Sequence, residues 1–287
     1  MGAHAMGIAT WVVSCLAFAT HVIAQSRSQQ LCPAQSTAVC EPEDENRVCN
    51  LRSACLEEFS EANWSLEALW PDTNEETRKA RTRCEKSRIA LNRNQPVAVP
   101  KFTEVGYLKS RVPEETFAAI RDWHSQNVGT EKVEKWLDDN TYVNHWKVPT
   151  YMIRVPHWLK EQVQIDMQML MEEWAGVTLK PTSLYGVRHY HRGAVLAAHV
   201  DRVETHVISA IINVAQDVDN RWPLFVRGHD GVDQEIFIEP GDMILYESAS
   251  VIHGRPTPFN GEFFANLFLH YAPTEGWNIR GSDISRN

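Results

Sequence analysis

The chain has 287 residues, of which 43% are hydrophobic and 23% are charged. It is therefore long enough to bury a large core, and its composition excludes a disordered, collagen-like or multi-span membrane protein. Lys and Arg total 28 against 37 Asp and Glu, which gives a net charge of −9. Nucleic-acid binding needs basic surfaces, so we expect no nucleic-acid partner.

An apolar run occupies residues 7–24 and ends in Val22-Ile23-Ala24. Such a run before a small residue is typical of a secretory signal peptide, and we expect residues 1–24 to be removed by cleavage after Ala24. The alternative is an uncleaved membrane anchor, because no Lys or Arg precedes the run and its length approaches that of a membrane span. The expected location is the endoplasmic reticulum lumen or the extracellular space, or a membrane surface if the run is retained.

Residues 25–100 form a polar, Cys-containing region that is partly helical between residues 51 and 91, with a linker at Asn94-Gln95-Pro96. In a secreted chain the five cysteines left after cleavage indicate two disulfides and one remaining thiol. The alternative to the disulfides is that all five thiols are reduced, in a cytosolic protein. The alternative to a folded helical region is a solvated stalk. The six cysteines of the whole chain are Cys15, Cys32, Cys40, Cys49, Cys55 and Cys84.

Two helices open the region 101–278. One begins near Pro113, which is expected to lie in its first turn. This helix carries Phe117, Ile120 and Trp123 at helical spacing. The other spans residues 158–174, and Gly176 is suited to its C-terminal cap. Both helices precede the β-rich part of the chain, so we expect them to pack on a sheet.

Short strands without intervening helices follow Pro181, each rich in β-branched or aromatic residues and bounded by turn residues. Such a series forms a sandwich or barrel, so the expected class is α+β: a jelly-roll core with preceding packing helices and a Cys-containing N-terminal helical region. Residues 279–287 form a C-terminal tail. The predicted strands are 184–190, 206–214, 222–226, 235–238, 242–246, 250–255 and 263–271.

Two histidines and one aspartate have the pattern of an iron site. His199 and Asp201 stand two residues apart at a strand end, and His253 follows on a later strand. Two imidazoles and one carboxylate on one face form the facial triad of non-haem Fe(II) oxygenases, which leaves positions open for a co-substrate and O₂. We therefore predict His199, Asp201 and His253 as metal ligands, with His206 as the first substitute for either histidine.

The other histidines have structural interpretations. His189, His191 and His229 are expected in turns or at the surface. His206 and His270 alternate with apolar neighbours, which favours core positions with satisfied hydrogen bonds.

The surrounding motifs resemble those of the prolyl 4-hydroxylase family of Fe(II)- and 2-oxoglutarate-dependent dioxygenases, best over residues 184–271. The resemblance implies a double-stranded β-helix core, Fe(II), 2-oxoglutarate and O₂, with ascorbate as a candidate additional cofactor. It also implies cofactor binding by Tyr190, a peptide or protein substrate with proline the leading target, and succinate and CO₂ as co-products. It rests on Tyr190-His191-Arg192-Gly193 before His199-Val200-Asp201, on Pro240–Tyr246, on His253-Gly254-Arg255-Pro256, on Gly261 and on Ala265–Phe268.

One position departs from the family. The lysine that pairs with the far carboxylate of 2-oxoglutarate there corresponds to Phe263. Arg255 is the predicted replacement, because it follows His253 by two residues and would share its face on a strand. The alternative is an outward-facing Arg255 in a turn, in which case Arg202 or Arg188 is the anchor.

Two other functions are consistent with these patterns. One is a jelly-roll non-haem iron oxygenase that acts on a small molecule. The other is a secreted binding module that kept the barrel and lost turnover. Succinate release that depends on a defined substrate distinguishes these functions from peptidyl hydroxylation.

Overall fold

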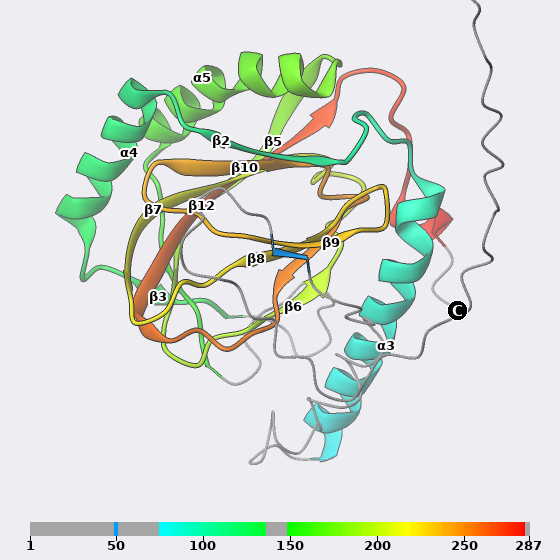
Figure 1. Ribbon diagram of the computed structural model, residues 1–287, viewed down its shortest axis with the longest axis horizontal. Helices are drawn as coiled ribbons and strands as arrows, with labels where there is room; N and C mark the ends of the chain where they lie inside the picture. Colours follow the sequence, from blue (N-terminus) through cyan, green and yellow to red (C-terminus); the bar gives the residue numbers. More distant parts are fainter. Residues whose placement is uncertain (1–48, 51–74, 136–147, 285–287) are drawn as a thin grey trace, which may run out of the picture. The chain divides into compact units, whose positions relative to one another are not determined.

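The computed structural model describes residues 49–50, 75–135 and 148–284, and Figure 1 shows their arrangement. The chain divides into two compact units, Met1–Pro33 and Ala34–Asn287, and every described residue belongs to the second. The expected signal peptide or anchor and most of the Cys-containing region therefore lie outside the described residues. Within the described part, no helix is long and apolar enough to cross a membrane.

Two antiparallel sheets form the core of the fold. The five-stranded sheet has the order β1-β9-β8-β11-β6, and the seven-stranded sheet has the order β2-β10-β7-β12-β5-β4-β3. The strands are β1 (Cys49–Asn50), β2 (Tyr107–Arg111), β3 (Lys132–Val133), β4 (Tyr151–Ile153), β5 (Leu179–Tyr190), β6 (Leu196–His199), β7 (Ile208–Val218), β8 (Leu224–Arg227), β9 (Asp233–Ile236), β10 (Asp242–Tyr246), β11 (Ile252–Arg255) and β12 (Gly261–Pro273).

Alternation along the strands creates two apolar clusters. On β10, Ile244 and Tyr246 belong to an inner cluster that also contains Leu224 and Val226 of the small sheet. Met243 belongs to an outer cluster, which the helices share. Successive side chains point to opposite faces of a strand, so the large sheet is buried on both sides. This is an α+β jelly roll, as the sequence predicted.

Helices α4 (Glu114–Asn127) and α5 (His157–Ala175) cover the outer face of the large sheet (Figure 1). On α5, Leu159, Val163, Met167 and Met171 recur every four residues and are 0% exposed. Gly176 ends the helix with a φ of 69°, the left-handed conformation that a residue without Cβ adopts at little cost. Pro113 is the N-cap of α4 rather than a residue of its first turn.

Helix α3 (Glu75–Ala98) corrects one expectation. The predicted linker Asn94-Gln95-Pro96 lies in its last turns, and Gln95 is 1% exposed. Pro96 lies two residues before the end of α3, so the hydrogen bond that it cannot donate is lost only in the last turn. The predicted strand 242–246 coincides with β10, whereas the short strand β6 was missing from the predicted series.

A buried histidine pair joins α4 to β5 outside the barrel. His124 Nε2 lies 2.9 Å from His189 Nε2, and both residues are 3% exposed. The expectation that His189 lies in a turn or at the surface is therefore wrong, because it sits on the outer face of β5 beneath α4. Burial and the neighbouring His124 lower the pKa of His189 to about 4, although Glu131 opposes the shift.

This pair predicts a loss of stability in mild acid. An unfolded histidine takes up a proton below its ordinary pKa of about 6.5, whereas folded His189 stays neutral down to about pH 4. Protons therefore favour the unfolded state between these values, and His189 should cost roughly 2 kcal/mol between pH 7 and pH 5. Denaturant unfolding of wild type and His189→Gln at both pH values measures how much of the loss in unfolding free energy is due to His189.

The exposed His157 supplies the control for this experiment. Its side chain is 81% exposed, so His157→Gln should keep the wild-type difference between pH 7 and pH 5. An undiminished difference in His189→Gln would contradict the assignment.

Candidate metal centre

The three predicted metal ligands converge at the junction of β6 and β11. These strands pair antiparallel, with His253 directly opposite His199, and Asp201 follows β6 by two residues. One ligand atom from each of the three residues lies within 4.8 Å of the others. The Nε2 atoms of His199 and His253 lie 3.5 and 3.9 Å from the Asp201 carboxylate oxygens. This spacing fits a single metal ion held on one face.

A glycine permits the close approach of the two strands. A Cβ atom at Gly254 would lie 2.7 Å from the Ala198 Cα, closer than real Cβ contacts allow. The missing side chain of Gly254 thus lets β11 approach the backbone of β6, and the ring centroids of His199 and His253 lie 4.5 Å apart.

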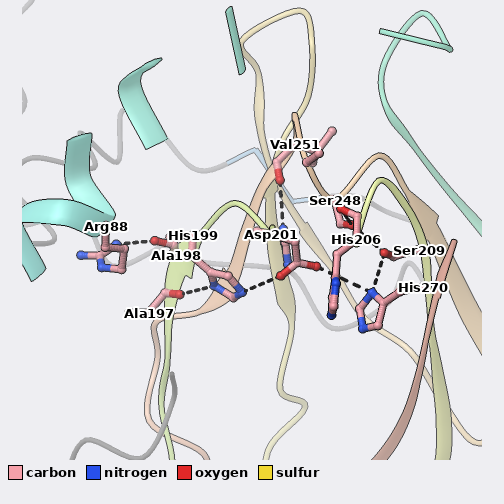
Figure 2. A network of polar contacts seen from close by, with 12 residues as sticks. Arg88, Ala197, Ala198, His199, Asp201, His206, Ser209, Ser248, Val251 and His270 are labelled. Atoms are coloured by element: carbon pink, nitrogen blue, oxygen red, sulfur yellow. Dashed lines mark hydrogen bonds and ion pairs between the residues drawn. The ribbon is translucent and has the colours of Figure 1, made fainter. Parts of the chain in front are cut away.

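Backbone carbonyls orient both histidine rings. His199 Nδ1 lies 2.7 Å from the Ala197 carbonyl oxygen (Figure 2). His253 Nδ1 lies 2.9 Å from the Val251 carbonyl oxygen. A neutral imidazole that donates from Nδ1 leaves the Nε2 lone pair available to a metal. Each ring is therefore held in the tautomer that a metal ligand needs.

The ionisation of the site matches metal binding. Burial acts to raise the pKa of Asp201, but the hydrogen bond with His199 and the nearby His253 outweigh it and hold the pKa well below its usual range. Burial and the neighbouring His199 lower the pKa of His253 to about 4. The site thus offers a carboxylate and a neutral imidazole at neutral pH, the forms that bind metals.

Two further histidines lie beside the triad: His206, which the sequence named as a substitute ligand, and His270, whose place in the site the sequence did not indicate. His206 and His270 have ring centroids 3.8 Å apart, and His270 Nδ1 lies 3.9 Å from an Asp201 oxygen. His270 also contacts the Ser209 hydroxyl at 2.7 Å (Figure 2). Each ring makes a hydrogen bond through Nδ1, His206 with Thr205 and His270 with Ser209, and both residues line the cavity described below. His206 is not part of the triad.

His229 lies in the turn between β8 and β9, which agrees with the expected turn or surface position. Its side chain is nevertheless only 4% exposed, and its Nε2 lies 2.9 Å from the Ser250 hydroxyl. It therefore helps to hold the turn before β11.

A cavity of about 860 Å³ reaches the three candidate ligands, near the upper end of the range for small-molecule sites. Besides the triad, its wall includes Tyr246, Phe268, His206, His270, Arg188 and Arg202. Burial raises the pKa of Tyr246 well above 10, so its phenol stays neutral.

The two predicted co-substrate residues, Tyr190 and Arg255, lie inside the barrel. Tyr190 is fully buried in the inner cluster. Arg255 is 1% exposed, lies between the rings of Trp222 and Phe264 at 4.7 and 4.6 Å, and donates to the Trp222 carbonyl at 2.6 Å. Phe263 packs on the outer face against His189 instead. Arg255 does not belong to the cavity lining, whereas Arg188 and Arg202 do.

Helix α3 holds the strand that carries His199 and Asp201. β6 is the last strand in the described order of the small sheet, so one side of its backbone lacks a strand partner among the described residues. Asn92 Nδ2 donates to the Ala198 carbonyl at 2.8 Å, and Arg88 donates to the same oxygen. Gln95 Nε2 donates to the carbonyls of Asp201 at 2.7 Å and Ala249 at 2.8 Å. These buried side chains fix the backbone on both sides of the candidate ligands.

Comparison with known proteins gives a fold-level likeness. No family model matches the chain, and no curated protein matches it in sequence. It is similar to a Pseudomonas putida prolyl-4-hydroxylase, at 12% identity and a TM-score of 0.42, over 59% of this chain and 93% of that one. It is also similar to HygX from Streptomyces hygroscopicus with nickel and 2-oxoglutarate bound, at 10% identity and a TM-score of 0.44, over 61% of this chain and 86% of that one. A third similar structure is an oxidoreductase of the 2OG-Fe(II) oxygenase family from Burkholderia pseudomallei, at 12% identity and a TM-score of 0.43, over 61% of this chain and 89% of that one. At such values, function must be argued from the site.

The hydrogen bonds from α3 predict an effect on metal affinity. Gln95→Leu keeps much of the side-chain volume but leaves two buried carbonyls without their donor, so the backbone around Asp201 should relax. Loss of a partner that orients metal ligands typically weakens binding about 10- to 100-fold. Titration with Mn(II), followed by electron paramagnetic resonance, measures the dissociation constant.

Gln168→Leu is the matched control. Gln168 donates to the Leu179 carbonyl at 2.9 Å from α5, away from the triad, so its loss should leave metal affinity unchanged. Equal affinities in wild type and a folded Gln95→Leu variant would refute the role of α3.

Proposed function

We propose that this chain is an Fe(II)- and 2-oxoglutarate-dependent dioxygenase that hydroxylates a peptidyl substrate, with proline the leading target. The observation that carries the proposal is the convergence of His199, Asp201 and His253 on a cavity inside a jelly roll. Fe(II) and 2-oxoglutarate, when bound, would supply O₂-dependent hydroxylation with succinate and CO₂ as co-products. The choice of a peptide and of proline rests on the motif resemblance.

The chain's own residues would bind Fe(II) and orient its ligands. The triad would hold Fe(II) through two Nε2 atoms and a carboxylate, while the carbonyls of Ala197 and Val251 keep the rings in place. The apolar inner cluster would keep bulk water from the reacting groups.

Arg255 is the proposed partner of the 2-oxoglutarate carboxylate. Its Nη2 atom has no hydrogen-bond partner among the described residues, and burial lowers its pKa to about 10. A buried cation without a counter-ion is costly, so an incoming carboxylate would be stabilised there. Arg188 is the alternative, because it lines the cavity, but Glu134 already occupies its guanidinium at 2.6 and 3.0 Å.

Removal of one candidate metal ligand should abolish the proposed activity. Asp201→Asn keeps the shape and removes the charge, so Mn(II) affinity should fall by more than about 100-fold, beyond the loss typical of a supporting residue. Conversion of 2-oxoglutarate to succinate should disappear with it. Asp122→Asn, which changes a carboxylate that is 62% exposed on α4, should retain both properties. Wild-type metal affinity in Asp201→Asn would contradict the proposed ligand set.

The two arginines are distinguished by the 2-oxoglutarate Michaelis constant at saturating iron. Truncating one partner of a buried charge pair costs about 2–5 kcal/mol, so Arg255→Gln should raise this constant about 30-fold or more. Arg255→Lys keeps the charge but loses the planar fork, and should give a smaller rise. An unchanged constant in a folded Arg255→Gln variant, with a rise in Arg188→Gln, would assign the anchor to Arg188.

The reaction itself is tested with Fe(II), labelled 2-oxoglutarate and a library of proline-containing peptides. Succinate release coupled to a mass gain of one oxygen atom on a peptide is the expected result. Coupled turnover with small molecules alone would exclude the peptidyl substrate, and no turnover in the presence of bound metal would favour a binding module.

A further inference from the structure

The cavity wall continues beyond the barrel onto a short β-hairpin. β3 and β4 extend the large sheet past β5, and Lys132 pairs with Met152, which pairs with Arg188. Directly opposed residues of antiparallel strands point to the same face. Lys132 therefore lies on the same face as Arg188, and all three residues line the cavity.

This outer part of the cavity wall is cationic. Lys132, Lys135 and Arg154 line the cavity and are exposed, and no ion pair joins any of them to another described residue. We call these three residues the basic rim.

Among the described residues of the lining, neither acidic side chain forms an ion pair with Lys132, Lys135 or Arg154. Glu134 is engaged by Arg188, with N–O distances of 2.6 and 3.0 Å, and Asp201 belongs to the candidate metal site. The whole chain carries a net charge of −9, so a cationic cavity entrance runs against its composition. Clustered charge of one sign at a cleft attracts ligands of the opposite sign.

The same hairpin offers a place for an extended chain. β3 is the outermost described strand of the large sheet, and its Val133 side chain is 48% exposed. An outer strand presents backbone N–H and C=O groups that an added peptide strand can pair with. A peptide at this edge would run beside Lys132 and Lys135, whereas a compact small molecule would not use the edge.

We propose that the basic rim and the β3 edge bind an acidic peptide, whose Asp or Glu side chains flank the residue presented to the metal. The inference deepens the proposed function by naming the class of peptide, and its reaction rests on that function. The binding step does not, because it depends on charge and backbone pairing at the hairpin.

The test measures binding and turnover on the same full-length preparations. Fluorescence anisotropy compares proline-containing peptides flanked by Asp and Glu with matched peptides flanked by Asn and Gln, at low and high salt. Wild type should bind the acidic set more tightly, and added salt should remove the difference. Lys132→Gln/Arg154→Gln should weaken binding of the acidic set about five- to tenfold, as expected for two exposed charge pairs, and affect the neutral set less.

The control is Lys101→Gln/Lys180→Gln, which removes two exposed cations that do not line the cavity. It matches the change in net charge and should bind both peptide sets as wild type does. Equal losses in both double variants would attribute the effect to net charge and overturn the proposal. Equal wild-type affinity for the acidic and neutral sets would overturn it as well.

A second arm distinguishes a peptide from a small anion. Free dicarboxylates and sugar phosphates compete against the labelled acidic peptide, and competition only at much higher concentration supports a peptide. Tighter binding of a small anion overturns the peptide assignment. Mn(II) binding and 2-oxoglutarate decay, measured in parallel, report separately on the proposed function. If both are absent while the selectivity for acidic peptides remains, the proposed enzymatic function is refuted and the peptide-binding inference stands.

Discussion

The pairing of β6 with β11 is the contact on which the candidate metal centre depends. It places His253 opposite His199, and the strands approach closely because Gly254 has no side chain to meet the backbone of Ala198. Asp201 then follows from the chain direction after β6. A shift of one residue in this register would turn one histidine to the other face of the sheet, so register and ligand geometry are the same constraint.

The outer position of β6 explains why a helix is needed beside it. An outer strand has unpaired backbone groups, and here buried side chains of α3 occupy the carbonyls of Ala198 and Asp201. The helix before the barrel is thus part of the framework of the site. Backbone carbonyls satisfied in this way hold the candidate ligands more firmly than solvent would.

The cations of the cavity wall and of the barrel interior have distinct environments. Arg188 is paired with Glu134, whereas Arg255 lies between aromatic rings with an unpartnered Nη2. The exposed Lys132 and Arg154 continue the wall outward. The buried position of Arg255 suits a buried carboxylate, whereas the exposed positions of Lys132 and Arg154 suit a solvated anion. The reason is that burial decides how strongly a cation needs a partner.

The sequence by itself determined the local elements and the candidate ligands. The four-residue spacing on α5, the αL cap at Gly176 and the strand 242–246 are encoded in near neighbours, and His199, Asp201 and His253 formed a pattern that needed no structure. Tertiary structure alone decided what depends on distant residues. Asn94-Gln95-Pro96 has the composition of a linker, yet Gln95 reaches carbonyls more than a hundred positions away. β6 is too short and alanine-rich to signal a strand, and His189, His206 and Arg255 acquired their surroundings from elements far along the chain. Local propensity cannot encode such contacts, because they form only when the two sheets and their helices pack together.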